Sequence, residues 1–276
     1  MGQWGRHYLM CPPDYFDVAY SINPWMVGEE VDRPHAKDQW ATLATAIEAA
    51  GGIVETITPQ PGLPDMVFTA NAGIVSRTRF VPSRMRYRER RDEPALAARW
   101  MEARGLDVIE IPHGCFEGSG DALPFGDGAD RRLVAGYGPR SDTAAWDEIA
   151  AATGLTITPL PLVDTRFYHI DLVFCPLDER RALVAPIGLT AEGLAEMRRI
   201  VPEPILVDDA EALRFVTNSI VVNDTILMPH CSPRIGRLLE QAGLEPVVVD
   251  VGEFTKAGGA IRCLTLPLDV DGDFPA

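Results

Sequence analysis

Cysteine, histidine and carboxylate side chains lie in short polar segments that come directly before or within apolar runs. Cys263 ends GGAIRC, His169 and Asp171 lie in FYHIDLVF, and Glu117 lies in FEGSGD. A thiolate can attack an electron-poor carbon, a histidine can transfer protons, and carboxylates can hold a cation. In an extended strand, the His-x-Asp spacing places both side chains on one face. Together these residues indicate a nucleophile, an acid/base and a cation-binding cage.

Taken singly, each of these residues has a commoner interpretation. A cysteine in an apolar run is usually a small buried hydrophobe. A lone histidine there is more often a hydrogen-bonded core residue, and Glu117 among glycines fits a solvated loop. The other four cysteines keep the first interpretation: Cys11, Cys115, Cys175 and Cys231. Five widely spaced cysteines without a CxxC predict neither a disulfide framework nor a zinc cluster.

The elements that must position these residues repeat along the chain. Apolar residues three or four positions apart predict five amphipathic helices, at 37–50, 93–104, 142–153, 190–200 and 233–242. Glycines follow four of them, where a helix commonly ends. A short β-branched run after each helix predicts a strand: GIVETIT, LDVIEI, LTITPL, EPILVD and EPVVVDV. Hairpins are predicted at 70–83, 120–136, 170–186 and 218–229.

A fifth hairpin is divided between the two ends of the chain. Residues 258–268 supply one apolar run, and 6–13 could supply its partner. The chain therefore predicts five modules of hairpin, helix and strand, and a ring of five modules would leave no exposed sheet edges. In such a ring the polar segments before the hairpins would converge at one end of a central channel. An ordinary α/β sandwich with mixed sheets is the alternative.

Composition narrows the class of protein. The 276 residues are 46% hydrophobic, which provides for a large core. The formal charge of −15, from 25 Lys+Arg against 40 Asp+Glu, argues against binding the phosphate backbone of nucleic acids. The negative charge is compatible with attraction of a cationic small molecule, but taken alone it is more typical of a charge that keeps a protein soluble. No apolar stretch approaches the length of a membrane span, and no signal peptide is recognisable. We expect a cytoplasmic protein without nucleic-acid or membrane partners.

Three of the segments resemble motifs of the guanidine-modifying enzymes, or penteins. FEGSGDAL resembles their Glu-Gly-Gly-Asp motif, YHIDLVF their His-x-Asp motif, and GGAIRCLTLPL their segment with Gly-Gly and the nucleophilic cysteine. DMVFTANAG stands where the family has its first guanidinium-binding carboxylate. The resemblance covers nearly the whole chain. It implies an α/β fold, the five-bladed pentein propeller of ββαβ modules, and one catalytic domain over residues 1–276.

The resemblance also implies roles for particular residues. Cys263 would attack the guanidinium carbon and form an S-alkylthiouronium intermediate, His169 would protonate the leaving amine and then activate water, and Glu117 would orient the imidazole. The expected substrate-binding residues are Asp171, Asn71, Asp121, Arg140, Arg90, Asn23, Gly118 and Asp65. Asp171 would pair with two guanidinium N–H groups. No metal and no cofactor are implied.

The substrate α-carboxylate would be bound by Arg140 and by one member of the basic run RMRYRERR. Arg90 is chosen over Arg86, Arg88 and Arg91, and the alternative is that the whole run is a solvated surface.

The sequence departs from the family at three places, one of which is Ala70, where the family has an acid. Deiminases and dimethylarginine hydrolases carry an aspartate where this chain has Asn71, and FEGSGD is one residue longer than the usual motif. A carboxylate at that position favours a cation, whereas an amide can donate and accept hydrogen bonds and so retain the neutral ureido group of citrulline. Together with MCPPDYFDVAYSINPWM, this asparagine resembles the arginine dihydrolase branch, which forms ornithine, ammonia and carbon dioxide. Asn23, in SINPWM, would be a second amide near the site, or simply a turn residue.

The expected function is therefore a cysteine-dependent hydrolase of the guanidino group of free arginine. The alternatives are a dimethylarginine dimethylaminohydrolase or arginine deiminase that forms citrulline, an amidinotransferase, and a pentein binding module without activity. The partner would be arginine or an N-methylated arginine. The oligomeric state stays open, and a homo-oligomer is compatible with the sequence.

Overall fold

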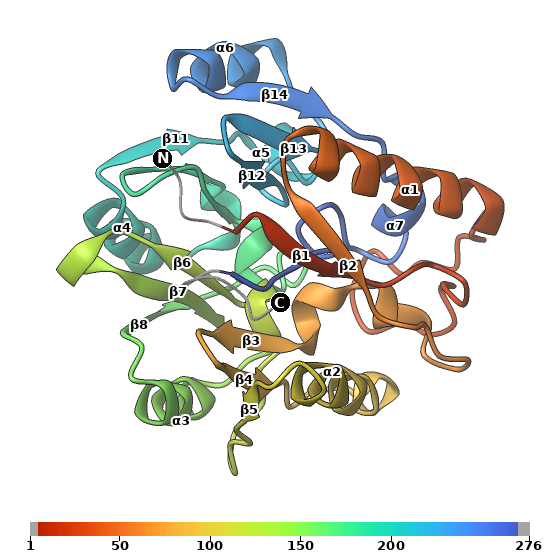
Figure 1. Cartoon of the computed structure of the whole chain (residues 1–276). Coiled ribbons are helices and arrows are strands. Elements are labelled where there is room, and N and C mark those ends of the chain that lie inside the picture. Colours follow the sequence, from red (N-terminus) through yellow and green to blue (C-terminus); the bar gives the residue numbers. More distant parts are fainter. Residues whose placement is uncertain (1–4, 270–276) are drawn as a thin grey trace.

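Five small sheets surround the centre of the molecule in the computed structural model, which describes residues 5–269 (Figure 1). Each sheet in this range has three strands, in the orders β15-β1-β2, β3-β4-β5, β6-β7-β8, β9-β10-β11 and β12-β13-β14. In each, an antiparallel hairpin is followed by a helix and by a strand that pairs in parallel with the second hairpin strand. The prediction of an α/β pentein with five ββαβ modules is confirmed, and the sandwich alternative is not adopted.

The strands are short. Their bounds are β1 His7–Met10, β2 Ile53–Thr56, β3 Gly73–Ser76, β4 Arg79–Pro82, β5 Asp107–Val108, β6 Ala122–Phe125, β7 Arg132–Tyr137 and β8 Ile157–Pro161. The remaining strands are β9 Phe174–Pro176, β10 Arg181–Val184, β11 Glu203–Leu206, β12 Ile220–Val222, β13 Thr225–Met228, β14 Glu245–Val248 and β15 Leu266–Pro267.

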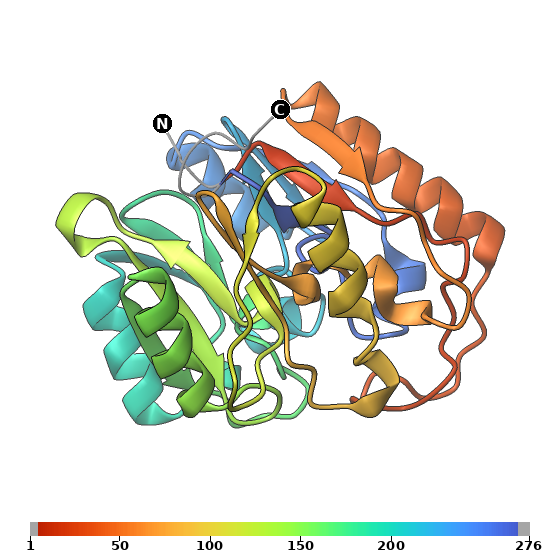
Figure 2. The same cartoon turned by 60° about the horizontal axis from the view of Figure 1, so that its bottom comes forward.

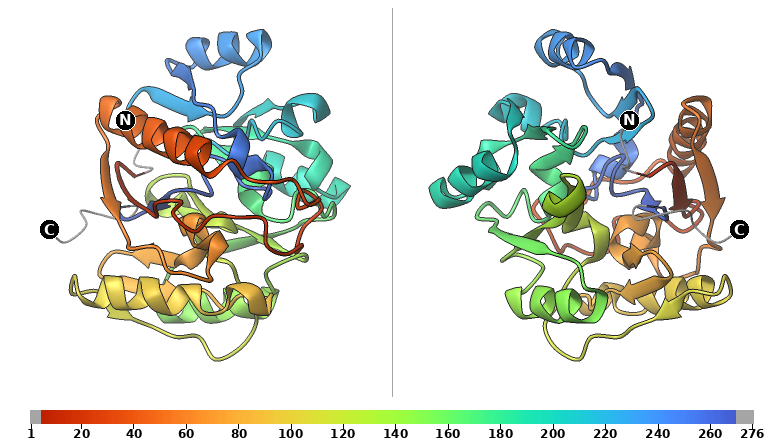
Figure 3. Two further views of the ribbon diagram at one scale, coloured as in Figure 1. Left: turned by 90° about the vertical axis from the view of Figure 1, so that its right-hand side faces the viewer. Right: turned by 60° about the vertical axis from the view of Figure 1, so that its left-hand side comes forward.

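The five longer helices lie on the outer side of the sheets (Figures 1 and 3). They are α1 Arg33–Ala49, α2 Glu93–Glu102, α3 Thr143–Thr153, α4 Ala191–Ile200 and α6 Pro233–Gln241, close to the predicted ranges. Helix α1 begins earlier than its apolar pattern, because Asp32 caps it by accepting a hydrogen bond from the His35 N–H. Helix α3 ends at Gly154, whose left-handed φ of 74° suits glycine. Two one-turn helices, α5 Asp209–Ala212 and α7 Gly252–Thr255, are too short for the pattern to reveal.

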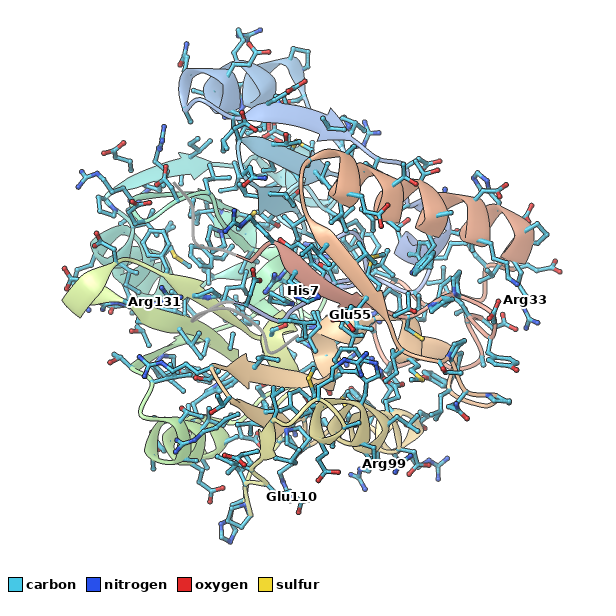
Figure 4. All side chains as sticks on the ribbon, viewed as in Figure 1. His7, Arg33, Glu55, Arg99, Glu110 and Arg131 are labelled. Carbon is cyan, nitrogen blue, oxygen red and sulfur yellow. The ribbon has the colours of Figure 1, made fainter. Side chains whose placement is uncertain are left out.

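The two ends of the described chain complete one sheet. In β1 and β15, Tyr8 pairs with Pro267 and Leu9 with Leu266, in antiparallel register. Figure 2 shows the first and last parts of the described chain side by side. This confirms that the fifth hairpin is divided between 6–13 and 258–268. On the other side of β1, Nε2 of His7 lies 2.8 Å from Oε1 of Glu55 in β2, and Figure 4 shows these two side chains next to each other.

Short 3-10 turns precede the first strand of three sheets, at Thr69–Ala72, Gly118–Gly120 and Ile170–Leu172. The corresponding segment before β12 contains Asn218, and the one before β15 contains Cys263. Thus the same place in each module carries polar residues, and these places are buried. Between residues 5 and 269, no helix is long and apolar enough to cross a membrane.

Candidate active site

Cys263 is buried and is contacted by two polar side chains. Its thiol lies 3.3 Å from Oδ2 of Asp171, and Nδ2 of Asn218 donates to Sγ at 3.1 Å. Oδ1 of Asn218 accepts from the Cys263 backbone N–H at 3.2 Å, so one amide holds both the backbone and the sulfur. Burial, together with the neighbouring Asp171 carboxylate, raises the pKa of the Cys263 thiol well above its ordinary value. The free protein therefore holds a protonated thiol at this position.

Two buried carboxylates present an oxygen that has no partner among the described residues. These atoms are Oδ1 of Asp171 and Oδ1 of Asp65. Burial raises the pKa of Asp171 to about 7 and also raises that of Asp65. Because an unpaired buried carboxylate oxygen is costly, the arrangement favours a ligand that brings positive charge and N–H donors.

His169 is held by Glu117, which is itself held by Arg140. Nε2 of His169 lies 2.9 Å from Oε2 of Glu117, and Nη1 of Arg140 donates to the same oxygen at 2.7 Å. Burial by itself raises the pKa of Glu117, but Arg140 and His169 hold this pKa well below its usual range. An ionised Glu117 fixes the hydrogen on Nε2 and leaves Nδ1 of His169 as the atom that can exchange protons.

Asn71 faces that free nitrogen. Its Nδ2 lies 3.5 Å from Nδ1 of His169 and donates to the carbonyl oxygen of Glu117 at 3.2 Å. Gly120 lies at the place where these side chains come together. A Cβ atom at this position would lie 2.5 Å from Nδ2 of Asn71 and 3.5 Å from both Oδ2 of Asp171 and Nδ1 of His169. The structure thus brings Asn71, His169 and Asp171 together around Gly120, and Cys263 lies next to them through its contact with Asp171.

Asp121 braces the loops that carry the site. Its Oδ1 accepts from the backbone N–H of Ile170, between His169 and Asp171, and its Oδ2 accepts from Oγ of Ser141 at 2.6 Å. Both carboxylate oxygens are therefore engaged within the protein, and a direct contact between Asp121 and substrate stays a prediction. Gly118 has a left-handed φ of 66°, and a Cβ there would lie 2.4 Å from the carbonyl oxygen of Ala70. It lets the Glu117 loop pack against the Asn71 turn.

The two arginines expected to bind a carboxylate are both buried. Arg140 lies between the rings of Tyr87 and Tyr168, donates to Glu117 and donates through Nη2 to the carbonyl oxygen of Ile22. Arg90 contacts Glu93, Asn71 and Asp65. A contact of either arginine with a substrate carboxylate stays a prediction.

The other members of the basic run take different places. Arg86 donates its backbone N–H to Glu117 and forms an ion pair with Asp142, Arg88 is exposed, and Arg91 donates to the carbonyl oxygens of Met85 and Arg86. Only part of the run is a solvated surface.

Asn23 lies beside the segment that leads to the thiol. Its Nδ2 donates to the carbonyl oxygen of Ala257, and its Oδ1 accepts from the N–H of Trp25. Tyr168 holds the same segment, because its hydroxyl donates to the carbonyl oxygen of Gly258 at 2.7 Å. Asn23 therefore supports the cysteine loop in this geometry, and its contact with substrate stays a prediction.

Sequence reasoning did not give a role to Asn218, Tyr168, Glu93 or Ser141. For Asn218 the signal was its place before the fourth hairpin, equivalent to the place of Asn71 before the first. Tyr168 and Ser141 contribute through Gly258 and Asp121, which are distant in sequence, whereas Glu93 pairs with Arg90 only three residues away. Within residues 5–269, no group of three or more His, Cys, Asp or Glu side chains is arranged to hold a metal ion.

Comparison with known proteins places this site in a family. A family model described as N,N dimethylarginine dimethylhydrolase, eukaryotic, matches residues 22–270. The chain belongs to this dimethylarginine hydrolase family. It is therefore related to hydrolases that act on carbon–nitrogen bonds.

Relatives of the chain within and around the dimethylarginine hydrolase family carry two different names. The chain is 41% identical, over 94% of its length, to the bifunctional arginine dihydrolase/ornithine cyclodeaminase ArgZ of Synechocystis, and it spans 37% of that protein. It is 38% identical, over 95% of its length, to the N(G),N(G)-dimethylarginine dimethylaminohydrolase of Mycobacterium tuberculosis, of which it covers 86%. A cyanobacterial structure of the N-terminal domain of ArgZ bound to substrate matches with a TM-score of 0.91 and 39% identity, covering 95% of this chain and 97% of that one.

Proposed function

We propose that this protein is an arginine dihydrolase, in which Cys263 is the nucleophile and one catalytic domain spans residues 1–276. The observation that carries the substrate class is the buried carboxylate of Asp171, whose Oδ1 has no hydrogen-bond partner among the described residues. Oδ1 of Asp65 also has none there, although the Tyr20 hydroxyl and Arg90 lie beside this carboxylate. A guanidinium and an α-ammonium group would supply the missing donors. The solved ArgZ domain bound to substrate, which shares 39% identity with this chain, supports the same substrate.

The first hydrolysis would remove ammonia. As the guanidinium approaches Asp171, its positive charge favours the thiolate of Cys263, and the thiol proton passes to His169. The thiolate adds to the guanidinium carbon, and Nδ1 of His169 protonates the leaving nitrogen, so that an S-alkylthiouronium forms. His169 then removes a proton from water, the hydroxide adds to the same carbon, and the C–S bond breaks. The products are citrulline and ammonia.

The second hydrolysis would act on the citrulline that stays in the site. Its ureido group is neutral, so Asp171 holds it less strongly than it holds a guanidinium. Asn71 presents an amide N–H₂ toward the site, next to Nδ1 of His169. That donor can bind a ureido oxygen, which a carboxylate cannot do. Renewed attack by Cys263 releases ornithine, and water releases carbamate, which decomposes to ammonia and carbon dioxide. In total, arginine and two waters give ornithine, two ammonia and carbon dioxide.

A dimethylarginine dimethylaminohydrolase is the second candidate. It is favoured by the family model and by the 38% identity to the Mycobacterium tuberculosis enzyme. This activity would use the same thiol, histidine and carboxylates, and it would release citrulline and dimethylamine. Arginine deiminase and amidinotransferase are variants of the same chemistry. They differ from the dihydrolase in stopping at citrulline or in passing the amidino group to an amine.

Product analysis separates these functions. Purified protein is incubated with arginine, with N,N-dimethylarginine and with arginine plus glycine, and the products are followed over time by mass spectrometry. A dihydrolase yields ornithine from arginine, with citrulline at most transient. Citrulline that accumulates in proportion to arginine consumed would overturn the proposal, while dimethylamine or a guanidino product would favour the alternatives. Cys263→Ser serves as the control for thiol-dependent turnover and should be inactive on every substrate.

A further inference from the structure

Arg90 is the centre of a buried polar cluster that ends at Asn71. Its side chain is 4% exposed. Its Nε donates to both carboxylate oxygens of Glu93 at 3.1 Å, and its Nη2 donates to Oε2 of Glu93 at 2.7 Å. Nη2 also donates to the carbonyl oxygen of Asp65 at 3.1 Å, and Nη1 donates to Oδ1 of Asn71 at 2.9 Å. Arg90 therefore joins the first turn of α2 to the active site.

The donor count shows what Glu93 does. A guanidinium has five N–H groups in one rigid plane. The Glu93 carboxylate accepts from the edge of the guanidinium formed by Nε and Nη2. The carbonyl oxygen of Asp65 accepts the other hydrogen of Nη2. The plane is then fixed, and Nη1 is directed at Asn71, with at most one of its hydrogens left for a ligand. Bidentate pairing with a carboxylate is the geometry that gives an arginine both strength and direction.

The contact with Arg90 decides which way the Asn71 amide points. Its oxygen faces Arg90, so its nitrogen faces the carbonyl oxygen of Glu117 and Nδ1 of His169. The reversed amide would place Oδ1 against the Glu117 carbonyl oxygen and its N–H₂ against a guanidinium. Without the Arg90 donor, the buried oxygen of Asn71 would lose its partner and the amide would lose its fixed position.

We propose that Arg90 and Glu93 act together as a positioning pair that sets product specificity, by holding the Asn71 amide with its donor toward the substrate. This rests on the proposed function, because the specificity in question is ornithine against citrulline. Neither residue needs to touch the reacting atoms. Within the described residues, the Glu93 carboxylate hydrogen-bonds to Arg90, so Glu93 acts through Arg90, and Arg90 acts through Asn71.

The test compares two reactions of the same enzyme: consumption of arginine, and hydrolysis of citrulline supplied directly. Glu93→Gln keeps the shape of the side chain but can accept hydrogen bonds only through one oxygen. We expect the rate of citrulline hydrolysis relative to arginine consumption to fall by about tenfold, the change expected when one charge-assisted hydrogen bond is lost. Arg90→Lys, which cannot reach Glu93 and Asn71 in the same fork geometry, should give a shift in the same direction.

A matched control lies on the same helix. Glu102, at the end of α2, is exposed, so Glu102→Gln makes the same chemical change outside the cluster and should leave the ratio as in the wild type. Agmatine, which lacks the α-carboxylate, separates positioning from direct binding of that carboxylate by Arg90. If Arg90 binds it directly, Arg90→Lys raises KM for arginine but not for agmatine, and the product ratio stays constant.

The Asn71→Ala background supplies a second readout. If the pair acts through Asn71, Glu93→Gln should have no further effect on the ratio once Asn71 is truncated. Where Glu93→Gln does not fold, as judged by circular dichroism, Glu93→Asp keeps the charge but shortens the reach and should cause the same loss. An unchanged ratio in a folded Glu93 variant would overturn the proposal. Wild-type enzyme that forms citrulline but no ornithine would instead overturn the proposed function, so the two failures are distinguishable.

Discussion

The thiol of Cys263 donates to Oδ2 of Asp171 across 3.3 Å, and both side chains are buried. Burial and the neighbouring carboxylate raise the pKa of the thiol, and burial raises the pKa of the carboxylate to about 7, although the thiol hydrogen bond acts on the carboxylate in the opposite direction. In the absence of a cation, the pair therefore retains a proton. A guanidinium that pairs with Asp171 would stabilise the ionised forms of both groups, so the proton would leave the pair. The thiolate nucleophile would then form only where the substrate is bound.

The first prediction concerns the reactivity of this thiol. A cationic reagent such as 2-chloroacetamidine brings its own charge to Asp171, whereas neutral iodoacetamide does not. At pH 7 the cationic reagent should label Cys263 faster by about tenfold or more, relative to the reactivity of both reagents with a free thiol. Labelling with iodoacetamide should still be rising above pH 9, the ordinary thiol pKa. Mass spectrometry of the peptide that contains Cys263 provides the measurement, because Cys115 and Cys231 are partly exposed and will also react. A plateau below pH 8 with iodoacetamide would contradict this account.

The second prediction links Asp171 to stability. Its pKa is about 7 in the folded protein and ordinarily 3.8, so the folded state binds the proton more tightly. Stability from this group is fully present below pH 3.8 and is lost as the pH rises through 7. Asp171→Asn removes this loss. At pH 8 the variant should be more stable than wild type by up to about 4 kcal/mol, at 1.36 kcal/mol per pKa unit, and the gain should shrink toward pH 5.

Urea unfolding at pH 5 and pH 8 measures this effect. Activity of Asp171→Asn should fall by about 100-fold or more, because the cation loses its charged partner. Asp142→Asn is the control with the opposite sign. Its carboxylate accepts from the Cys115 N–H and pairs with Arg86, which hold its pKa below the ordinary value. Replacing Asp142 should therefore destabilise the protein near pH 7 and matter less in acid. A gain that is equal at pH 5 and pH 8 for Asp171→Asn would exclude the linkage.

More of the fold than of the candidate site could be predicted from the sequence. Helix periodicity, glycines after helices and paired apolar runs are local signals, and they were sufficient for the five modules and for the hairpin formed by β1 and β15. The repeat also explains why Asn71, Glu117, His169, Asp171 and Cys263 meet, since they occupy similar places in their modules. The sequence pattern does not show how hydrogen-bond partners orient the side chains. Arg90 and Asp121 were expected at the substrate, but the donors and acceptors that orient them, Glu93 and Ser141, could be identified only from the folded structure.

The third prediction tests the amide of Asn71. Asn71→Asp keeps the contact with Arg90 but turns a carboxylate oxygen toward the Glu117 carbonyl oxygen and Nδ1 of His169. The added charge favours a cation over a neutral ureido group, so citrulline should be released instead of being hydrolysed. We expect the ornithine fraction to fall by about tenfold at similar arginine consumption. Asn223→Asp, in the exposed turn between β12 and β13, is the control for a change of charge. An unchanged ornithine yield would remove the charge argument for the dihydrolase.

The fourth prediction concerns Gly120, where an added Cβ atom would meet three residues of the candidate site. Its φ is not left-handed, so alanine is compatible with the backbone, and the cost comes from contact alone. The new Cβ would lie 2.5 Å from Nδ2 of Asn71 and 3.5 Å from Asp171 and His169. A distance of 2.5 Å is much shorter than a nonbonded contact between carbon and nitrogen. The Asn71 amide must therefore move, and the substrate must lose room. Gly120→Ala should lower kcat/KM by about 100-fold, and the second hydrolysis should suffer more than the first.

Gly236 offers the matched comparison for this substitution. It lies within helix α6, where a Cβ would meet Sγ of Cys231 at 3.5 Å, an ordinary contact. Gly236→Ala should stabilise the protein by up to about 1 kcal/mol through helix propensity and leave turnover as in the wild type. Thermal melts of both variants separate folding from catalysis. If Gly120→Ala melts like wild type and retains its kcat/KM, then the point shared by Asn71, His169 and Asp171 is not where the substrate binds, and the site must lie elsewhere along these loops.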